Sequence, residues 1–133
     1  MADVVVLDAS AAVELLVGGP RAGRISRRLK GATLTAPAHV DAEVLSALGR
    51  LQRGGHLDSA TVDELLDSLE QAPVVRVPIA AMLRRAYALR ANVALRDALY
   101  VVVAADVRGD LVTVDEGLAD ACRRRQLCRV ADL

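Results

Sequence analysis

Aromatic side chains are almost absent from this sequence, which has two tyrosines and neither phenylalanine nor tryptophan. Domains that bind single-stranded nucleic acid by stacking its bases on several aromatic rings are therefore excluded. Cysteine is scarce too, and Cys122 with Cys128 can form neither a disulfide framework nor a zinc site of four ligands by themselves. We expect both thiols to be buried as small apolar groups.

Long hydrophobic runs are also missing. The longest, Ala98–Ala105, is far shorter than the roughly 20 apolar residues that a membrane-spanning helix needs. Ala2–Asp8 lacks the basic start and the apolar length of a secretion signal, so we expect a cytoplasmic protein without membrane contact. The 133 residues, 53% of them hydrophobic and 26% charged, are typical of one globular domain, expected to span residues 1–133.

Neither sign of charge is in excess, because seventeen acidic side chains balance seventeen basic ones. This excludes a general polyanion-binding protein with a uniformly basic surface. The charges are unevenly placed, however, since Pro20–Lys30 contains bases only and Asp58–Glu70 acids only. Arg21, Arg24 and Arg28 fall on one helical face of the basic segment. This stripe is either solvated surface or a track for the phosphates of a nucleic acid.

Short β-branched runs alternate along the chain with patterns of helical period. The runs that predict strands are Val4–Leu7, Thr33–Thr35, Val74–Val77, Leu111–Val114 and Cys128–Val130. Helices are predicted at Ser10–Val17, at His39–Arg53, from a capping box at Thr61–Glu64 to Glu70, from Pro78 to Arg90, and at Glu116–Arg125. Asp97–Val107 fits either a strand or a buried helix. The alternation predicts an α/β fold whose mostly parallel central sheet is flanked by helices on both faces.

Four carboxylates occupy places where chemistry is expected in such a fold. Asp8 and Asp115 each follow a predicted strand directly, and parallel sheets bind ligands beyond the carboxyl ends of their strands. Asp97 opens the ambiguous segment, and Glu43 borders the apolar stripe of its helix. Taken singly, each aspartate also fits the role of a helix N-cap, and Glu43 that of a solvated residue.

The four carboxylates together favour a metal site. Clustered carboxylates repel one another and have no structural purpose unless a cation holds them. Oxygen ligands favour Mg²⁺ or Mn²⁺ over zinc, and such sites activate water and clamp phosphate oxygens. His39 lies four residues before Glu43, so a histidine–carboxylate metal pair is an alternative to a polar residue in the first turn of that helix.

Four segments of the chain resemble those of the PIN-domain nucleases, and within that family they are most similar to the VapC toxins of bacterial toxin–antitoxin pairs. The segments are Val5–Ala11, Glu43–Leu48, Leu95–Val101 and Leu111–Asp115. The similarity runs through nearly the whole chain, with the four acids in the order of the family. It implies that Asp97–Val107 is a helix.

The resemblance further implies a single α/β/α nuclease domain whose catalytic acids form one site for Mg²⁺ or Mn²⁺, namely Asp8, Glu43, Asp97 and Asp115. Asp8 and Asp97 are then the first metal ligands, and the other two acids bind a second ion or orient the attacking water. Ser10 and Thr113 match small hydroxyl residues that often accompany the site. RNA as the substrate, a homodimer and a cognate VapB-type antitoxin are implied in the same way.

Two other classes of aspartate-centred protein need residues that this chain lacks, and one alternative stays open. A phosphatase of the haloacid-dehalogenase kind needs a second acid two residues after its nucleophile, where this chain has Ser10. A phospho-acceptor receiver domain needs a lysine after a late strand, and Lys30 is the only lysine. The alternative from a different class is a non-catalytic PIN-fold module that acts through protein contacts. A lack of metal-dependent cleavage across a broad panel of RNAs would favour that module.

Overall fold

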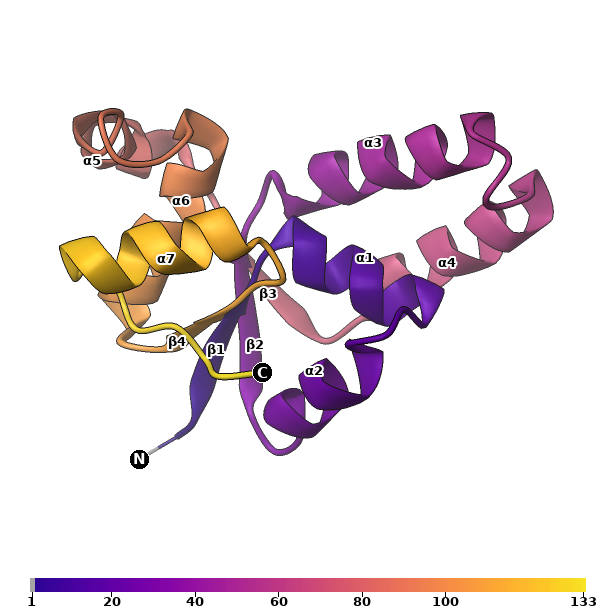
Figure 1. Ribbon diagram of the computed structural model, residues 1–133, viewed down its shortest axis with the longest axis horizontal. Helices are drawn as coiled ribbons and strands as arrows, with labels where there is room; N and C mark the ends of the chain where they lie inside the picture. The colour runs from indigo at the N-terminus through magenta and orange to yellow at the C-terminus, as the bar shows by residue number, and fades with distance from the viewer. Residues whose placement is uncertain (1) are drawn as a thin grey trace.

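The computed structural model describes residues 2–133, and its elements alternate as predicted (Figure 1). The strands are β1 (Val4–Leu7), β2 (Thr33–Pro37), β3 (Val74–Val77) and β4 (Asp110–Val112). The helices are α1 (Ala9–Val17), α2 (Ala22–Leu29), α3 (Val40–Arg53), α4 (Ser59–Gln71), the 3₁₀ helix η1 (Ala80–Met82), α5 (Leu83–Ala88), α6 (Leu95–Val107) and α7 (Glu116–Arg125). The predicted α/β class is confirmed.

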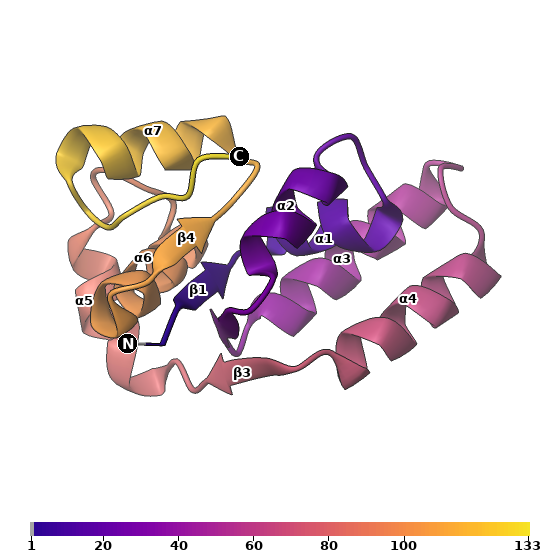
Figure 2. The same cartoon turned by 90° about the horizontal axis from the view of Figure 1, so that it is seen from below.

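All four strands are parallel, in the order β3-β2-β1-β4. The chain moves outward from β1 to β2 and β3, then crosses back to place β4 on the other side of β1. Because such crossovers are right-handed, the helices α1 to α4 cover one face of the sheet and α6 covers the other. Figures 1 and 2 show α1 to α4 on one side of the sheet and α6 on the opposite side. The direction in which the chain adds strands therefore reverses between β1 and β4. Open parallel sheets bind ligands at such a point.

Helix α6 forms the centre of the core. Its residues from Ala98 to Ala104 are buried one after another, because the helix packs against β1, β2, β4 and α5. The buried middle of this helix has no polar face, which explains why its sequence pattern fits either a strand or a buried helix. The helix implied by the family resemblance is confirmed. The two thiols are free, with Cys122 buried and Cys128 partly buried.

Gly109 lets β4 enter the sheet beside β1. A β-carbon at this position would overlap the carbonyl oxygen of Val4, so a larger residue would push the two strands apart. In the resulting register Leu7 pairs with Val112. The residues that follow these two, Asp8 and Thr113, therefore emerge side by side at the carboxyl end of the sheet.

The start of α4 differs from the prediction. The helix begins at Ser59 and is capped by Asp58, whose carboxylate accepts a hydrogen bond from the backbone N–H of Thr61 at 2.7 Å. Thr61 is therefore not the N-cap, and the predicted capping box is wrong. Asp58 is an equally good cap three residues earlier, and the longer helix gains backbone hydrogen bonds.

Two further segments also differ from the prediction. Cys128–Val130 forms no strand, because only an isolated bridge pairs Val130 with Leu111. The segment from Pro78 to Arg90 forms η1 and the short α5 in place of one continuous helix.

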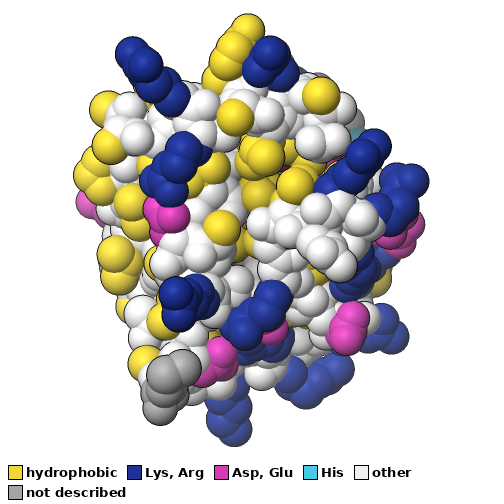
Figure 3. Space-filling view, turned by 90° about the vertical axis from the view of Figure 1, so that its left-hand side faces the viewer, with side chains coloured by type: hydrophobic (Ala, Val, Ile, Leu, Met, Phe, Trp, Pro, Cys, Tyr) yellow, Lys and Arg dark blue, Asp and Glu magenta, His cyan; other side chains and the backbone are white. Residues whose placement is uncertain are grey.

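No helix within residues 2–133 combines the length and the apolar character needed to cross a membrane. Figure 3 shows the molecule from the side of α5, α6 and α7, where basic side chains lie among acidic and apolar ones. That intermixing on this face agrees with the net charge of zero.

Candidate functional site

Asp8 follows the last residue of β1 and is almost fully buried, with 4% of its surface exposed. Its Oδ1 accepts hydrogen bonds from the backbone N–H of Ala11 at 2.9 Å and from Ser10 Oγ at 2.7 Å, and its Oδ2 accepts one from Thr113 Oγ1. Burial raises the pKa of the Asp8 carboxyl to about 6, against the hydrogen bonds, which lower it. Asp8 thus caps α1 and also lies at the predicted site.

Two hydroxyl groups join the ends of β1 and β4. Thr113 Oγ1 donates to Asp8 and accepts a hydrogen bond from the backbone N–H of Asp115 at 3.0 Å. Ser10 Oγ also donates to Asp8 and accepts from the backbone N–H of Val114 at 3.1 Å. These bonds explain why β4 ends at Val112, since Thr113 and Val114 turn toward β1. Asp115 itself caps α7.

Glu43 lies in the first turn of α3 and is held by α6. The hydroxyl of Tyr100 donates to Glu43 Oε1 at 2.6 Å, and burial, followed by this hydrogen bond, raises the pKa of Tyr100 above its usual value. His39 Nε2 lies 3.3 Å from the same oxygen and donates to the carbonyl oxygen of Arg96 at 2.9 Å. Because this nitrogen carries a proton, it is not available as a metal ligand in this arrangement.

Asp97 lies in the first turn of α6 and is not its N-cap. The helix begins at Leu95 behind Ala94, whose side chain makes no capping hydrogen bond. The N-cap interpretation of Asp97 is therefore wrong, because Ala94 O already accepts the first helical hydrogen bond, from Ala98 N, at 2.9 Å. Burial raises the pKa of Asp97, and the negative charges of Asp115 and Glu43 raise it further.

All four predicted acids line one cavity of about 640 Å³. Ser10, His39, Arg50, Arg96 and Tyr100 line it as well. Sequence analysis did not single out Tyr100, Arg50 and Arg96. The available signal was helical spacing, because Tyr100 lies three residues after Asp97 and Arg50 lies two turns after Glu43, on the same helix faces.

The chemistry of these carboxylates fits a hard divalent cation. Their mutual repulsion contributes to the raised pKa of Asp97, and a bound cation would relieve it. Within residues 2–133, however, no three His, Cys, Asp or Glu side chains are grouped so that they could hold a metal ion as they lie. Asp8 and Glu43 are instead engaged by hydroxyl donors. The donor set therefore fits a cation, and binding one requires side-chain movement.

Arg21 and Arg24 lie beside the acidic cavity. Both line a second cavity of about 340 Å³, whose wall includes Asp115. Arg21 donates to the carbonyl oxygen of Val114 at 3.1 Å and pairs with Glu116 at 3.1 Å. These two arginines of the predicted stripe are therefore close to the predicted site.

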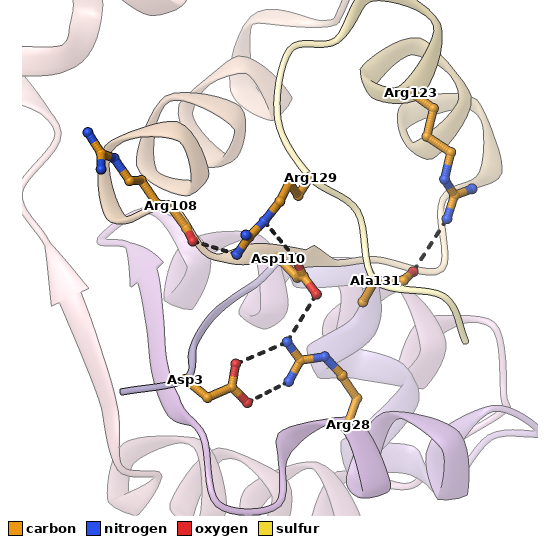
Figure 4. Close-up of polar contacts among 7 residues, drawn as sticks. All are labelled: Asp3, Arg28, Arg108, Asp110, Arg123, Arg129 and Ala131. Atoms are coloured by element: carbon orange, nitrogen blue, oxygen red, sulfur yellow. Dashed lines mark hydrogen bonds and ion pairs between the residues drawn. The ribbon is translucent and has the colours of Figure 1, made fainter. Parts of the chain in front are cut away.

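Arg28 lies at the opposite end of the sheet (Figure 4). Its guanidinium donates to both carboxylate oxygens of Asp3, at 2.9 and 3.2 Å, and to Asp110 at 3.1 Å. Asp110 also pairs with Arg129 at 3.1 Å. Arg28 thus connects α2 to the starts of β1 and β4, and it lines neither of the two cavities that include Asp115.

Comparison with known proteins adds independent information. The sequence matches the PIN domain over residues 5–124. Ribonuclease VapC3 of Mycobacterium tuberculosis is 48% identical over 118 residues, which cover 88% of this chain and 86% of that protein. Ribonuclease VapC12 of the same species is 36% identical over 127 residues, covering 89% and 92%. The crystal structure of PAE2754 from Pyrobaculum aerophilum matches with a TM-score of 0.68 and 27% identity, over 91% of this chain and 81% of that one. This chain therefore belongs to the PIN-domain family, as the resemblance of its four acidic segments predicted.

Proposed function

We propose that this protein is a divalent-metal-dependent ribonuclease and the toxin of a VapBC-type pair. One observation carries the proposal: Asp8, Glu43, Asp97 and Asp115 come from four separate segments and line a single cavity beyond the carboxyl ends of β1 and β4. Similarity to two proteins named as VapC ribonucleases supports RNA as the substrate. Retention of the whole acidic set argues against a non-catalytic module.

Asp8 and Asp97 would be the first ligands of Mg²⁺ or Mn²⁺, and Glu43 and Asp115 would complete the site or orient the attacking water. When bound, such a cation lowers the pKa of water and neutralises charge that develops on phosphate oxygens. The all-oxygen donor set is the feature of this chain that favours these two metals.

Hydrogen bonds of the chain itself prepare the acidic groups for this role. The hydroxyls of Ser10 and Thr113 fix the orientation of Asp8, and Thr113 also holds the backbone of Asp115. The hydroxyl of Tyr100 fixes Glu43 Oε1. These bonds restrict the positions of Asp8 and Glu43 before the substrate arrives, which lowers the entropy cost of assembling the site, although a bound cation still requires some side-chain movement.

The substrate phosphates would also meet the basic stripe. Arg21 and Arg24 support this assignment, because their cavity shares Asp115 with the acidic one. Arg28 would take part only if RNA displaced its partners Asp3 and Asp110.

The proposal includes a cytoplasmic homodimer that a VapB-type antitoxin neutralises. Leu83, Tyr87 and Leu95 support a protein contact surface, because these large apolar side chains are at least half exposed on α5 and α6. Light scattering of the purified chain would report a dimer as twice the 14.1 kDa mass of one chain.

A cleavage assay on a broad panel of RNAs tests the activity. We expect the wild type to cleave in Mg²⁺ or Mn²⁺, to stop in EDTA, and to be poorly active in Ca²⁺, whose looser coordination positions water and phosphate less well. Asp8→Asn should lose cleavage by orders of magnitude under every condition. Full activity in EDTA would contradict metal dependence, and no cleavage of any RNA would favour the non-catalytic module.

A further inference from the structure

The acidic cavity presents an electrostatic problem for an RNA substrate. Each phosphodiester is an anion, and four carboxylates line the cavity that it must enter. Fixed positive charge at the same cavity would offset this repulsion and guide the backbone. The lining of the cavity contains such positive charge.

Arg50 and Arg96 are the only arginines that line this cavity within residues 2–133. They come from different elements, Arg50 from the outer half of α3 and Arg96 from the first turn of α6. Arg50 lies two helical turns beyond Glu43, and Arg96 directly precedes Asp97. Each helix thus presents one acid and one arginine to the same cavity.

Both guanidinium groups are available to a ligand. Arg96 Nε lies 3.6 Å from Glu43 Oε2, and its side chain is 75% exposed. So long and exposed an ion pair is weak, and the other oxygen of Glu43 is already bonded to Tyr100. Arg50 is exposed, and no ion pair or side-chain hydrogen bond holds it among the described residues.

We propose that Arg50 and Arg96 bind the RNA phosphates that flank the one attacked at the acidic site. The proposal rests on the ribonuclease function proposed above. A guanidinium matches the oxygens of a phosphate with two parallel N–H donors, so arginine suits this task better than lysine. Contacts from α3 and α6 would add to those of Arg21 and Arg24, and RNA would be held by elements on both sides of the sheet.

Binding and cleavage assays with Arg50→Gln, Arg96→Gln and the double variant test the proposal. Arg53→Gln is the matched control, because Arg53 is an exposed arginine of α3 that does not line the cavity. The probe is a short, fluorescein-labelled, mixed-sequence single-stranded RNA. Its anisotropy is measured in Ca²⁺, which limits cleavage, at increasing KCl concentration.

We expect each single variant to raise the Kd for this RNA by about tenfold. The slope of log Kd against log [KCl] should fall by about 0.7 for each lost phosphate contact on a single strand. Cleavage in Mg²⁺ should show a raised KM with kcat nearly unchanged, since these residues bind the substrate away from the reacting bond. The Arg53 variant should match the wild type.

Two failures are distinguishable. If the wild type binds and cleaves RNA while the Arg50 and Arg96 variants keep its affinity and salt slope, the two arginines are solvated surface and this inference is wrong. A fall in kcat with unchanged KM would also overturn it. If the wild type neither binds nor cleaves any RNA, the proposed function fails, and the inference fails with it.

Discussion

At the scale of single residues, Asp8 combines a structural and a chemical role. Its carboxylate caps α1 through the N–H of Ala11, and it lines the acidic cavity. Burial raises its pKa to about 6, so keeping the group charged at neutral pH costs folding free energy. Hydroxyl donors from Ser10 and Thr113 offset part of that cost, because each bond favours the charged form.

Replacing Thr113 tests the importance of these hydroxyls. Thr113→Val removes the donor to Asp8 and the acceptor of the Asp115 N–H in a buried place, so we expect the free energy of unfolding to fall by about 1–3 kcal/mol. Thr113→Ser keeps the hydroxyl and should lose only about 0.8 kcal/mol for the missing methyl group. Chemical denaturation measures both. A valine variant as stable as the serine variant would show that the hydroxyl contributes nothing.

At the scale of elements, Arg28 links α2 to the starts of two strands. Arg28 donates to Asp3, before β1, and to Asp110, the first residue of β4. Its side chain is 24% exposed, more sheltered than that of Arg21. The bidentate geometry and the second carboxylate make this network stronger than an isolated surface pair.

Arg28→Ala should lower the denaturation midpoint, whereas Arg27→Ala, at an exposed neighbouring position, should not. The difference should depend on pH. The hydrogen bond from Arg28 holds the pKa of Asp3 below its usual value, so its stabilisation is present above the unfolded-state pKa of about 3.9 and is lost as the pH falls through the lower folded-state value. Chemical denaturation at neutral and at acidic pH measures the difference in midpoint between the two variants. If this difference grew at acidic pH, the proposed role of Arg28 would be contradicted.

Most elements could be predicted from the sequence because their signals are local. The β-branched run of β1 and the amphipathic stripe of α3 are examples. The start of α4 could not be predicted because Asp58 and Thr61 are both good N-caps. The backbone hydrogen bonds of the additional helical turn favour Asp58. The composition of Cys128–Val130 is the same whether the segment forms a strand or only the single bridge between Val130 and Leu111, so the sequence cannot distinguish the two.

The candidate site could be predicted only in part. Strand-end positions indicated Asp8 and Asp115, and the family resemblance added the order of the four acids. Contacts between distant segments could not be predicted, because they depend on how α3 and α6 pack. The hydrogen bond from Tyr100 to Glu43, across 57 positions of sequence, is one such contact. Outside the site, the hydrogen bond from Arg28 to Asp110, across 82 positions, depends in the same way on how α2 packs against the sheet.

At the scale of the whole molecule, a net charge of zero is compatible with local clusters of charge. The acidic cavity has arginines within it, on α3 and α6, and beside it, at the start of α2. RNA affinity should therefore depend on particular arginines more than on total charge.

Reversing one of these arginines tests that dependence. Arg24→Glu should weaken RNA binding and flatten its salt dependence, while binding of the antitoxin changes less. Arg27→Glu makes the same change of net charge at an exposed position of α2 outside both cavities, and should have a smaller effect. Anisotropy titrations at several salt concentrations provide the comparison. An unchanged RNA affinity of Arg24→Glu at low salt would show that this residue is solvated surface.

In the proposed function, four carboxylates converge on a site that a divalent cation binds. Its most direct test is the melting temperature of the wild type and of Asp97→Asn, each measured in EDTA and in Mg²⁺. The exposed Asp67→Asn is a control for the loss of one charge, because Asp67 lies on α4 outside the cavity. Asp97 is not an N-cap, so its replacement by asparagine removes no capping hydrogen bond.

In EDTA, Asp97→Asn should melt at the same temperature as the wild type or higher, because the change removes like-charge repulsion from Asp115 and Glu43. Mg²⁺ should raise the melting temperature of the wild type and of Asp67→Asn, through the linkage RT ln(1 + [L]/Kd), and that of Asp97→Asn distinctly less. If Mg²⁺ stabilised Asp97→Asn as much as the wild type, the account of a convergent carboxylate site would be contradicted.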